Sequence, residues 1–171
     1  MTVPTLAAPL LHDLAYLAMN MREDERAQWE ALTGMPYDAD IAARGFANIP
    51  GISFVLLDDE GRAFCAGGFE EIRPRVWQTW MAGTADGWAQ HWRAITKHSR
   101  RLMANLFESG RAQRVQTYAL ASRTGAHEWY RRGLQQQFEA THPCFFADGQ
   151  AAVCYARTIT MHQEAAHGQQ S

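Results

Sequence analysis

The first third of the chain places apolar residues at the spacing of helices. Apolar positions recur every three or four residues over 10–21, and a second segment continues through a charge cluster at 22–26. Gly34 follows its last periodic position, and a glycine there commonly ends a helix. A further short helix is expected over 38–47, before the Pro-Gly break at 50–51. The N-terminal third therefore predicts helices, and its pattern does not show whether a first strand is present.

From residue 52 the pattern changes to β-branched and aromatic runs. Residues 52–57 form one such run, an Asp-Asp-Glu-Gly turn follows, and 62–69 returns as the second arm of a hairpin. A further strand is expected over 76–81. Residues 87–109 then carry one apolar stripe at helical spacing, which predicts a long amphipathic helix.

The last third predicts a strand over 114–121, a helix over 124–132 closed by Gly133, and two final strands at 136–141 and 152–159. A strand–helix–strand unit inside a mostly antiparallel set requires one parallel pair of strands, with the long helix as its crossover. The fold class is therefore expected to be α+β, a mixed sheet with flanking helices.

Composition supports one globular domain. The chain has 171 residues, 47% of them hydrophobic and 20% charged, with a formal net charge of −2. Residues 1–160 are expected to form the domain, and 161–171, which lose the apolar pattern, a flexible tail. The charge balance argues against a nucleic-acid coat, and no apolar run approaches the ~20 residues that cross a membrane.

The cysteines and histidines suggest no special chemistry. Cys65, Cys144 and Cys154 form no C-x-x-C pair, so the expectation is reduced thiols rather than disulfides or a zinc site. The seven histidines are scattered, with His91 and His98 two helical turns apart. No metal site is expected.

The order of elements resembles the GNAT fold of Gcn5-type N-acetyltransferases, a mostly antiparallel twisted sheet whose one parallel strand pair splays apart. Local sequences also resemble a GNAT-like phage family that includes internal virion protein A of T7-like podoviruses. These stretches are AMNMRED at 18–24, EALTG at 30–34, VWQTWMAGT at 76–84, HWRAITKHSRRLM at 91–103 and RVQTYALASRTGAHEWYRRG at 114–133. This second resemblance implies a virion or morphogenesis protein, located in the virion and/or the host cytoplasm. Its partners would be other phage structural proteins or copies of itself.

The GNAT resemblance also implies where acetyl-CoA would bind. In that fold the cofactor lies between the splayed strands, with its pyrophosphate on main-chain amides in a glycine-rich loop before the long helix. Here the stretch 82–88 has its glycines at other spacings and includes Asp86 and Trp88, with Asp86 expected to cap the helix. No cofactor is therefore expected. If acetyl-CoA does bind, the expected contacts are Met81, Ala82, Gly83, Gly87 and Ser122.

The catalytic pattern of the fold is incomplete. Alignment on Gly133 puts Ser122 where the fold usually has Asn, and Trp129 where it has the Tyr that protonates the leaving thiolate. An indole N–H is only a hydrogen-bond donor, so the candidate acid is Tyr130, about 100° further round the helix. Glu70 is the candidate general base, because a carboxylate in an apolar cleft can have a raised pKa.

Aromatic and basic residues suggest an interface. Trp77 and Trp80 are three apart on one strand, so they face opposite sides of the sheet. The interface candidates are Trp77, Trp80, Trp129, Arg93, Lys97, Arg100 and Arg101. Three hypotheses follow: a catalytically degenerate phage protein that binds other proteins, an acetyl-CoA-dependent N-acetyltransferase acting on an amine or protein acceptor, and an accessory protein that contacts nucleic acid through the basic helix face.

Overall fold

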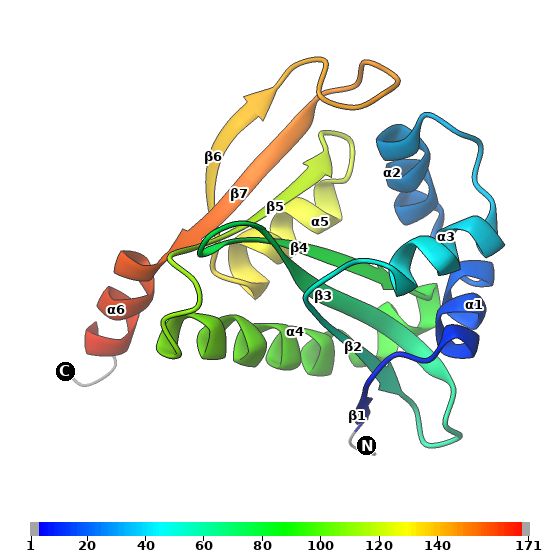
Figure 1. Cartoon of the computed structure of the whole chain (residues 1–171), viewed down its shortest axis with the longest axis horizontal. Coiled ribbons are helices and arrows are strands. Elements are labelled where there is room, and N and C mark those ends of the chain that lie inside the picture. Colours follow the sequence, from blue (N-terminus) through cyan, green and yellow to red (C-terminus); the bar gives the residue numbers. More distant parts are fainter. Residues whose placement is uncertain (1–3, 169–171) are drawn as a thin grey trace.

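In the computed structural model, which describes residues 4–168, seven strands form one twisted sheet in the order β1-β2-β3-β4-β5-β7-β6 (Figure 1). The strands are β1 Thr5–Ala7, β2 Ile52–Leu57, β3 Ala63–Arg73, β4 Val76–Gly83, β5 Arg114–Leu120, β6 Gln137–His142 and β7 Ala152–Thr158. Neighbouring strands are antiparallel except β4 and β5, which are parallel. This confirms the predicted α+β class with one parallel pair.

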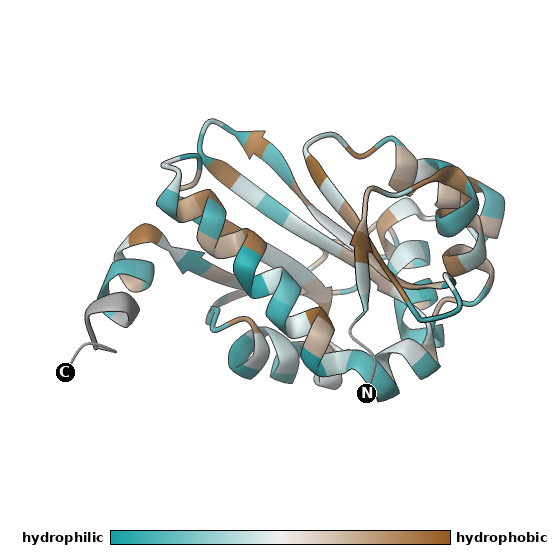
Figure 2. Ribbon diagram, turned by 90° about the horizontal axis from the view of Figure 1, so that it is seen from below, coloured by the Kyte–Doolittle hydropathy of each residue, from teal (hydrophilic) through white to brown (hydrophobic). Residues whose placement is uncertain are grey.

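Helices cover both faces of the sheet (Figure 1). The helices are α1 Leu11–Met19, α2 Glu23–Thr33, α3 Ala39–Ala47, α4 Ala85–Glu108, α5 Thr124–Glu128 and α6 Ile159–Gly168, with one π-helical turn, η1 Trp129–Gly133, continuing α5. α1 and α3 pack together over β2 and β3 on one face, whereas α4 packs on the other. Hydrophilic and hydrophobic residues alternate along α4, which is the pattern of a helix with one buried side (Figure 2).

Alternate residues of β2 supply the core on either side of the sheet. Phe54 and Leu56 pack with Ile95 of α4, whereas Val55 packs with Leu14 and other residues of α1 and α3. This alternation follows from the two-residue side-chain repeat of a strand. The sheet is therefore a central layer with a separate apolar cluster on each face.

The two tryptophans of β4 also face opposite sides, as predicted. Trp77 is 2% exposed in the cluster beneath α4, and its indole donates to the Arg111 carbonyl over 3.0 Å. Trp80 stacks on Phe46 of α3, with ring centroids 5.4 Å apart. Trp77 is therefore a core residue and is not available as the interface contact that its sequence position suggested, because its own sheet and α4 cover it.

Two terminal segments contain structure that the sequence pattern does not predict. Residues Thr5–Ala7 form β1, paired with β2, where the sequence leaves open whether a strand is present, because three residues are too few to show an alternating pattern. Residues Ile159–Gly168 form α6 where the predicted tail begins, and His162 stacks on Phe107 of α4. The last residues of the predicted tail, 169–171, lie outside the described residues, and the flexibility of this segment stays a prediction.

Candidate functional site

β4 and β5 separate soon after they pair. Their ladder joins Val76 with Arg114, Trp77 with Val115 and Gln78 with Gln116. One position further on, the strands are joined only through side chains, since the hydroxyl oxygens of Thr79 and Thr117 lie 2.6 Å apart. β4 then continues to Gly83 and β5 to Leu120 without ladder pairs between them. The parallel pair therefore splays into a crevice, as the fold resemblance implies.

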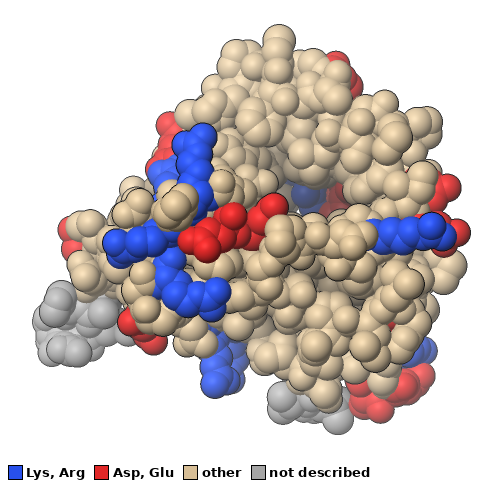
Figure 3. Space-filling view, viewed as in Figure 1, with Lys and Arg blue, Asp and Glu red and all other residues tan. Residues whose placement is uncertain are grey.

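A cavity of about 220 Å³, here called the crevice cavity, occupies this gap. Its lining combines residues that face α4, such as Phe69 and Ser99, with residues of the opposite face, such as Trp80 and Tyr118. Figure 3 shows the molecule hollowed between α2 and the strands β5–β7, with tan walls and a few blue and red atoms at the bottom. The crevice cavity therefore passes between the two strands and reaches both layers.

A second cavity of about 220 Å³, here called the α5 cavity, adjoins the first and extends past Trp88 and Trp92 of α4 to Gly125 of α5. The residues that line both cavities are Glu25, Met81, Arg123, Trp129 and Tyr130. These five residues mark the junction at which a molecule in one cavity would meet a molecule in the other.

Glu25 is the centre of this junction. It lies in the first turn of α2 and is 4% exposed. One carboxylate oxygen accepts from the amide of Gly83 over 2.7 Å, while the other accepts from Arg22 over 2.6 Å and from the Trp88 indole over 3.1 Å. The guanidinium of Arg123 lies 3.6 Å from the same oxygen. Four donor groups from separate parts of the fold thus converge on one buried carboxylate.

Burial and the neighbouring donors act on the Glu25 carboxyl in opposite directions. Burial raises the pKa of the Glu25 carboxyl, and the guanidiniums of Arg22 and Arg123 and the amide of Gly83 oppose that rise. Arg22 also lies over the Trp88 ring, 4.6 Å from its centroid, in a cation–π arrangement. A buried carboxylate held by two arginines is costly to break, because removing one partner leaves the others uncompensated.

The start of α4 differs from the expected phosphate loop. β4 ends at Gly83 and α4 begins at Ala85, so Thr84 alone connects them. The helix is capped by Thr84, whose hydroxyl accepts from the Gly87 amide over 3.0 Å. The predicted Asp86 cap is wrong, because Asp86 lies in the first turn and lines a polar pocket beside α1. The acid that reaches the crevice is Glu25.

The glycines of this segment have packing roles. A Cβ on Gly87 would lie 2.7 Å from the Phe64 carbonyl oxygen, and one on Gly83 would lie 2.7 Å from the Trp88 indole nitrogen. Both distances are shorter than real Cβ contacts, so α4 and Trp88 approach the sheet closely only because glycine stands there. Neither glycine lines the crevice cavity or the α5 cavity.

Tyr130 reaches the junction, and Trp129 lies beside it. Tyr130 is 6% exposed and lines both cavities, and burial raises the pKa of its hydroxyl. Trp129 donates through its indole to Thr96 over 2.8 Å and packs edge-on against Trp88. Both rings come from η1, whose wider turn is closed by the bond from the Leu134 amide to the Trp129 carbonyl. Because burial raises the pKa of the Tyr130 hydroxyl above its ordinary value of 10, that hydroxyl stays protonated at neutral pH.

The other predicted site residues lie apart from this junction, except Met81. Met81 lines both cavities, whereas Ala82 is fully buried beside it and lines neither. Glu70 is half-buried at the register position opposite Gln78, and it is not among the lining residues of the cavities described here. Ser122 is exposed just before α5, also outside them. Glu70 is thus not among the residues that line the crevice cavity, although its neighbour Phe69 and its partner Gln78 are.

The basic residues of α4 serve different purposes. Arg93, Lys97 and Arg101 are exposed, and the Arg93 guanidinium lies 5.0 Å from the Trp92 ring centroid. Arg100 instead donates to the carbonyl oxygens of Gly133 and Arg132, which ties α4 to the end of η1. Arg100 therefore joins α4 to η1. The exposed basic residues of α4 that could contact nucleic acid are Arg93, Lys97 and Arg101.

Glu25, Arg22 and Arg123 were missed as site residues from the sequence. Glu25 and Arg22 belong to the charge cluster at 22–26, and such a cluster usually marks a solvated helix face. The available signal was the spacing of Met21 and Trp29, which flank the cluster and turn one side of it inward. Among the described residues, no group of three or more His, Cys, Asp or Glu could hold a metal ion, and no helix is long and apolar enough to cross a bilayer.

No protein-family model matches the sequence, and no curated protein matches it either. Solved structures do match in fold. A GNAT-family acetyltransferase from Bacillus anthracis has a TM-score of 0.73 at 10% identity, covering 93% of this chain and 96% of that one. Spermidine N-acetyltransferase from Vibrio cholerae, solved with CoA and spermine, has a TM-score of 0.70 at 13% identity, covering 94% and 98%.

A third match is the ribosomal-protein-S18-alanine N-acetyltransferase from Escherichia coli, with a TM-score of 0.63 at 18% identity, covering 91% of this chain and 94% of that one. The fold of the chain is therefore the GNAT fold. None of these comparisons supports the resemblance to the phage family.

Proposed function

We propose that the protein is an N-acyltransferase that uses acetyl-CoA or a related acyl-CoA. The observation that carries this proposal is the pair of adjoining cavities at the parted strands, with a protonated tyrosine among the residues that line both. The similarity of fold to N-acetyltransferases, one of them solved with CoA, supports the same function. Of the three hypotheses raised by the sequence, this one fits the crevice best.

The residues of the α5 cavity fit the anionic part of the cofactor. Arg22 and Arg123 both line it, and both are paired with the carboxylates of Asp24 and Glu25. The Nε atom of Arg22 makes no hydrogen bond among the described residues and lies 3.5 Å from an Asp24 oxygen. Guanidinium groups bind phosphate strongly. In the GNAT fold a glycine-rich loop before the long helix binds the pyrophosphate, but here Thr84 alone connects β4 and α4. The side chains of Arg22 and Arg123 would therefore bind the phosphates in place of that loop. Acyl-CoA, when bound, supplies an acyl group activated as a thioester.

Two residues of the junction would support the transfer. Tyr130 holds a proton on its hydroxyl, because burial raises its pKa, and it can donate that proton to a departing thiolate. Glu25 fixes the guanidinium of Arg22 by a 2.6 Å bond and sits beside that of Arg123. Because its two oxygens are already engaged, Glu25 is a positioning residue. Aromatic side chains make up much of the lining of the crevice cavity.

Binding and turnover test the proposal. Free CoA at a hundred times its Kd should raise the unfolding free energy by about 2.7 kcal/mol in a thermal-shift experiment. With acetyl-CoA and an amine, Tyr130→Phe should slow CoA release by about 10²–10⁴-fold and leave CoA binding intact. Tyr155→Phe is the matched control, because Tyr155 packs 5.7 Å from Tyr130 in the same core cluster but lines neither cavity. No shift with millimolar CoA would overturn the proposal.

The second candidate is a non-catalytic phage virion or morphogenesis protein. One observation favours the absence of catalysis, though not the phage role: Glu25 already accepts from the Gly83 amide, and Thr84 is the one residue between β4 and α4. The same thermal-shift experiment separates the two candidates, since this one requires that CoA have no effect. Its protein partner or self-association stays a prediction, as does contact with nucleic acid.

A further inference from the structure

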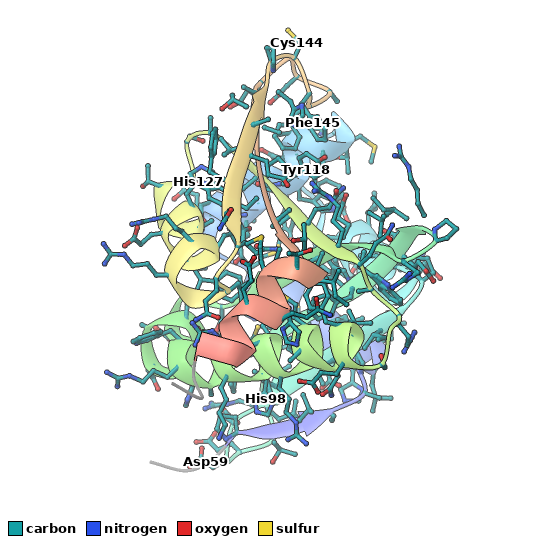
Figure 4. All side chains as sticks on the ribbon, turned by 90° about the vertical axis from the view of Figure 1, so that its left-hand side faces the viewer. Asp59, His98, Tyr118, His127, Cys144 and Phe145 are labelled. Atoms are coloured by element: carbon teal, nitrogen blue, oxygen red, sulfur yellow. The ribbon has the colours of Figure 1, made fainter. Side chains whose placement is uncertain are left out.

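The part of the crevice cavity that faces α2 and α3 has aromatic walls. Trp80 and Phe46 form one stacked pair, with their planes 4° apart. Tyr118 and Phe145 form a second pair, with centroids 4.8 Å apart and planes at 16°, and Figure 4 shows these two side chains together near the β6–β7 loop. All four residues line the cavity. Pairs stacked between separate elements present flat, fixed faces to whatever occupies the space.

The rim of this part is open and apolar. Leu32 of α2 is 54% exposed and Phe145 is 44% exposed, and both line the cavity. A volume of about 220 Å³ is below the roughly 300–1,000 Å³ of sites for drug-sized ligands. The space therefore suits a small molecule with an apolar body that enters past the rim.

Charge is scarce along the walls. Among the described residues that line the crevice cavity, the charged ones are Glu25 and Arg123. Glu25 is already bound to Arg22, so its negative charge is largely compensated. One ammonium group can lie against aromatic faces with Glu25 nearby, but the second and third ammonium groups of a polyamine would be desolvated without a carboxylate partner.

From these walls we infer that the acyl acceptor is a small primary amine carried on one aromatic or branched apolar group, and that polyamines are excluded. This inference rests on the proposed function. It names the acceptor class for the same site, and it differs from what the spermidine N-acetyltransferase of the same fold is named for. The aromatic body would lie between the Trp80 and Tyr118 walls, with its amine toward Glu25 and Tyr130.

Binding of 2-phenylethylamine and of spermidine to the full chain tests this directly, without cofactor. Trp29, Trp80 and Trp129 line the cavity, so bound ligand should change tryptophan fluorescence. We expect 2-phenylethylamine to bind at least ten times more tightly than spermidine. Phe145→Ala should weaken the binding of 2-phenylethylamine at least fivefold. Phe138→Ala is the matched control, since Phe138 is 57% exposed on β6 and does not line the cavity, and it should change the Kd less than twofold.

The outcomes separate this inference from the proposed function. Equal or tighter binding of spermidine, no binding of 2-phenylethylamine, or equal effects of Phe145→Ala and Phe138→Ala would each overturn the acceptor class. The proposed function fails instead if CoA does not bind. With acetyl-CoA as the acyl donor, 2-phenylethylamine should be converted to its N-acetyl derivative with release of CoA, at a rate at least ten times that of spermidine.

Discussion

At the scale of single residues, the most consequential side chain is a carboxylate from a charge cluster. Glu25 is buried where α2 meets the end of β4, and it accepts hydrogen bonds of 2.6–3.1 Å from Gly83, Trp88 and Arg22. Arg22 also donates its amide to the Gly83 carbonyl over 3.2 Å. The start of α2 is therefore joined to the last residue of β4 by two hydrogen bonds, one to its amide and one to its carbonyl.

Glu25→Ala should destabilise the fold by about 3–5 kcal/mol, because it leaves two guanidiniums and two N–H donors without their shared acceptor. Urea unfolding followed by tryptophan fluorescence measures this. Glu23→Ala is the control, since Glu23 is exposed in the same helical turn and should cost less than about 1 kcal/mol. Equal losses in the two variants would show that the Glu25 cluster contributes no special stability.

A second pair gives a pH-dependent prediction. Arg114 of β5 donates two hydrogen bonds to Glu139 of β6, one of them 2.7 Å long, and this lowers the pKa of the Glu139 carboxyl from its ordinary value of 4.5. As the pH falls, Glu139 therefore takes up a proton at a higher pH in the unfolded chain than in the folded chain. The stability contributed by this pair is complete above about pH 4.5 and is lost as the pH falls further.

In Glu139→Gln, the loss of unfolding free energy between pH 5 and pH 3 should be smaller than in the wild type. Arg114→Gln should reduce this pH-dependent loss of unfolding free energy by the same amount. The double variant should reduce it no further, because both residues act through the same ion pair. Urea titrations at a series of pH values provide the comparison. An acid-side slope unchanged by Glu139→Gln would contradict the prediction.

At the scale of elements, η1 determines which rings reach the crevice. Its π-helical turn ends at Gly133, where an added Cβ would lie 2.6 Å from Cδ1 of Trp129. Arg100 of α4 also bonds the Gly133 carbonyl. The close contact of Gly133 with the Trp129 ring therefore fixes the position of the indole, and with it the neighbouring Tyr130.

Gly133→Ala should destabilise the protein by about 1–3 kcal/mol, because the new methyl group overlaps the Trp129 ring and displaces its bond to Thr96. Gly125→Ala in α5 is the control: nothing lies within 4 Å of its added Cβ, and it should be neutral or stabilising by about 0.4–1 kcal/mol. Thermal unfolding followed by near-UV circular dichroism reports both stability and the tryptophan environment. Similar melting temperatures for the two variants would disprove the packing role.

At the scale of the whole molecule, most of the sheet was predictable, but only part of the candidate site was: Tyr130 and Met81 were named from the sequence, and Glu25 was not. The hairpin of β2 and β3, the strands β4 and β5 and the long helix α4 follow from local periodicity, which any short window of sequence carries. Glu25 could not be found this way, because its burial depends on contacts with Gly83 and Trp88, about 60 positions later in the chain. Periodicity also fails for β1, whose three residues gain their structure only by pairing with β2.

The connection through Thr84 restricts how the molecule can move. With one residue between β4 and α4, and its hydroxyl bonded to Gly87, strand and helix must shift together as one piece. The other lip of the opening, β5 with α5 and η1, is attached to β4 by only three residue pairs and the contact of two threonine hydroxyls. Admission of a bulky guest by an outward movement of that lip would therefore bend the short ladder and also break the bonds of Trp129 to Thr96 and of Arg100 to Gly133, which hold the lip against α4.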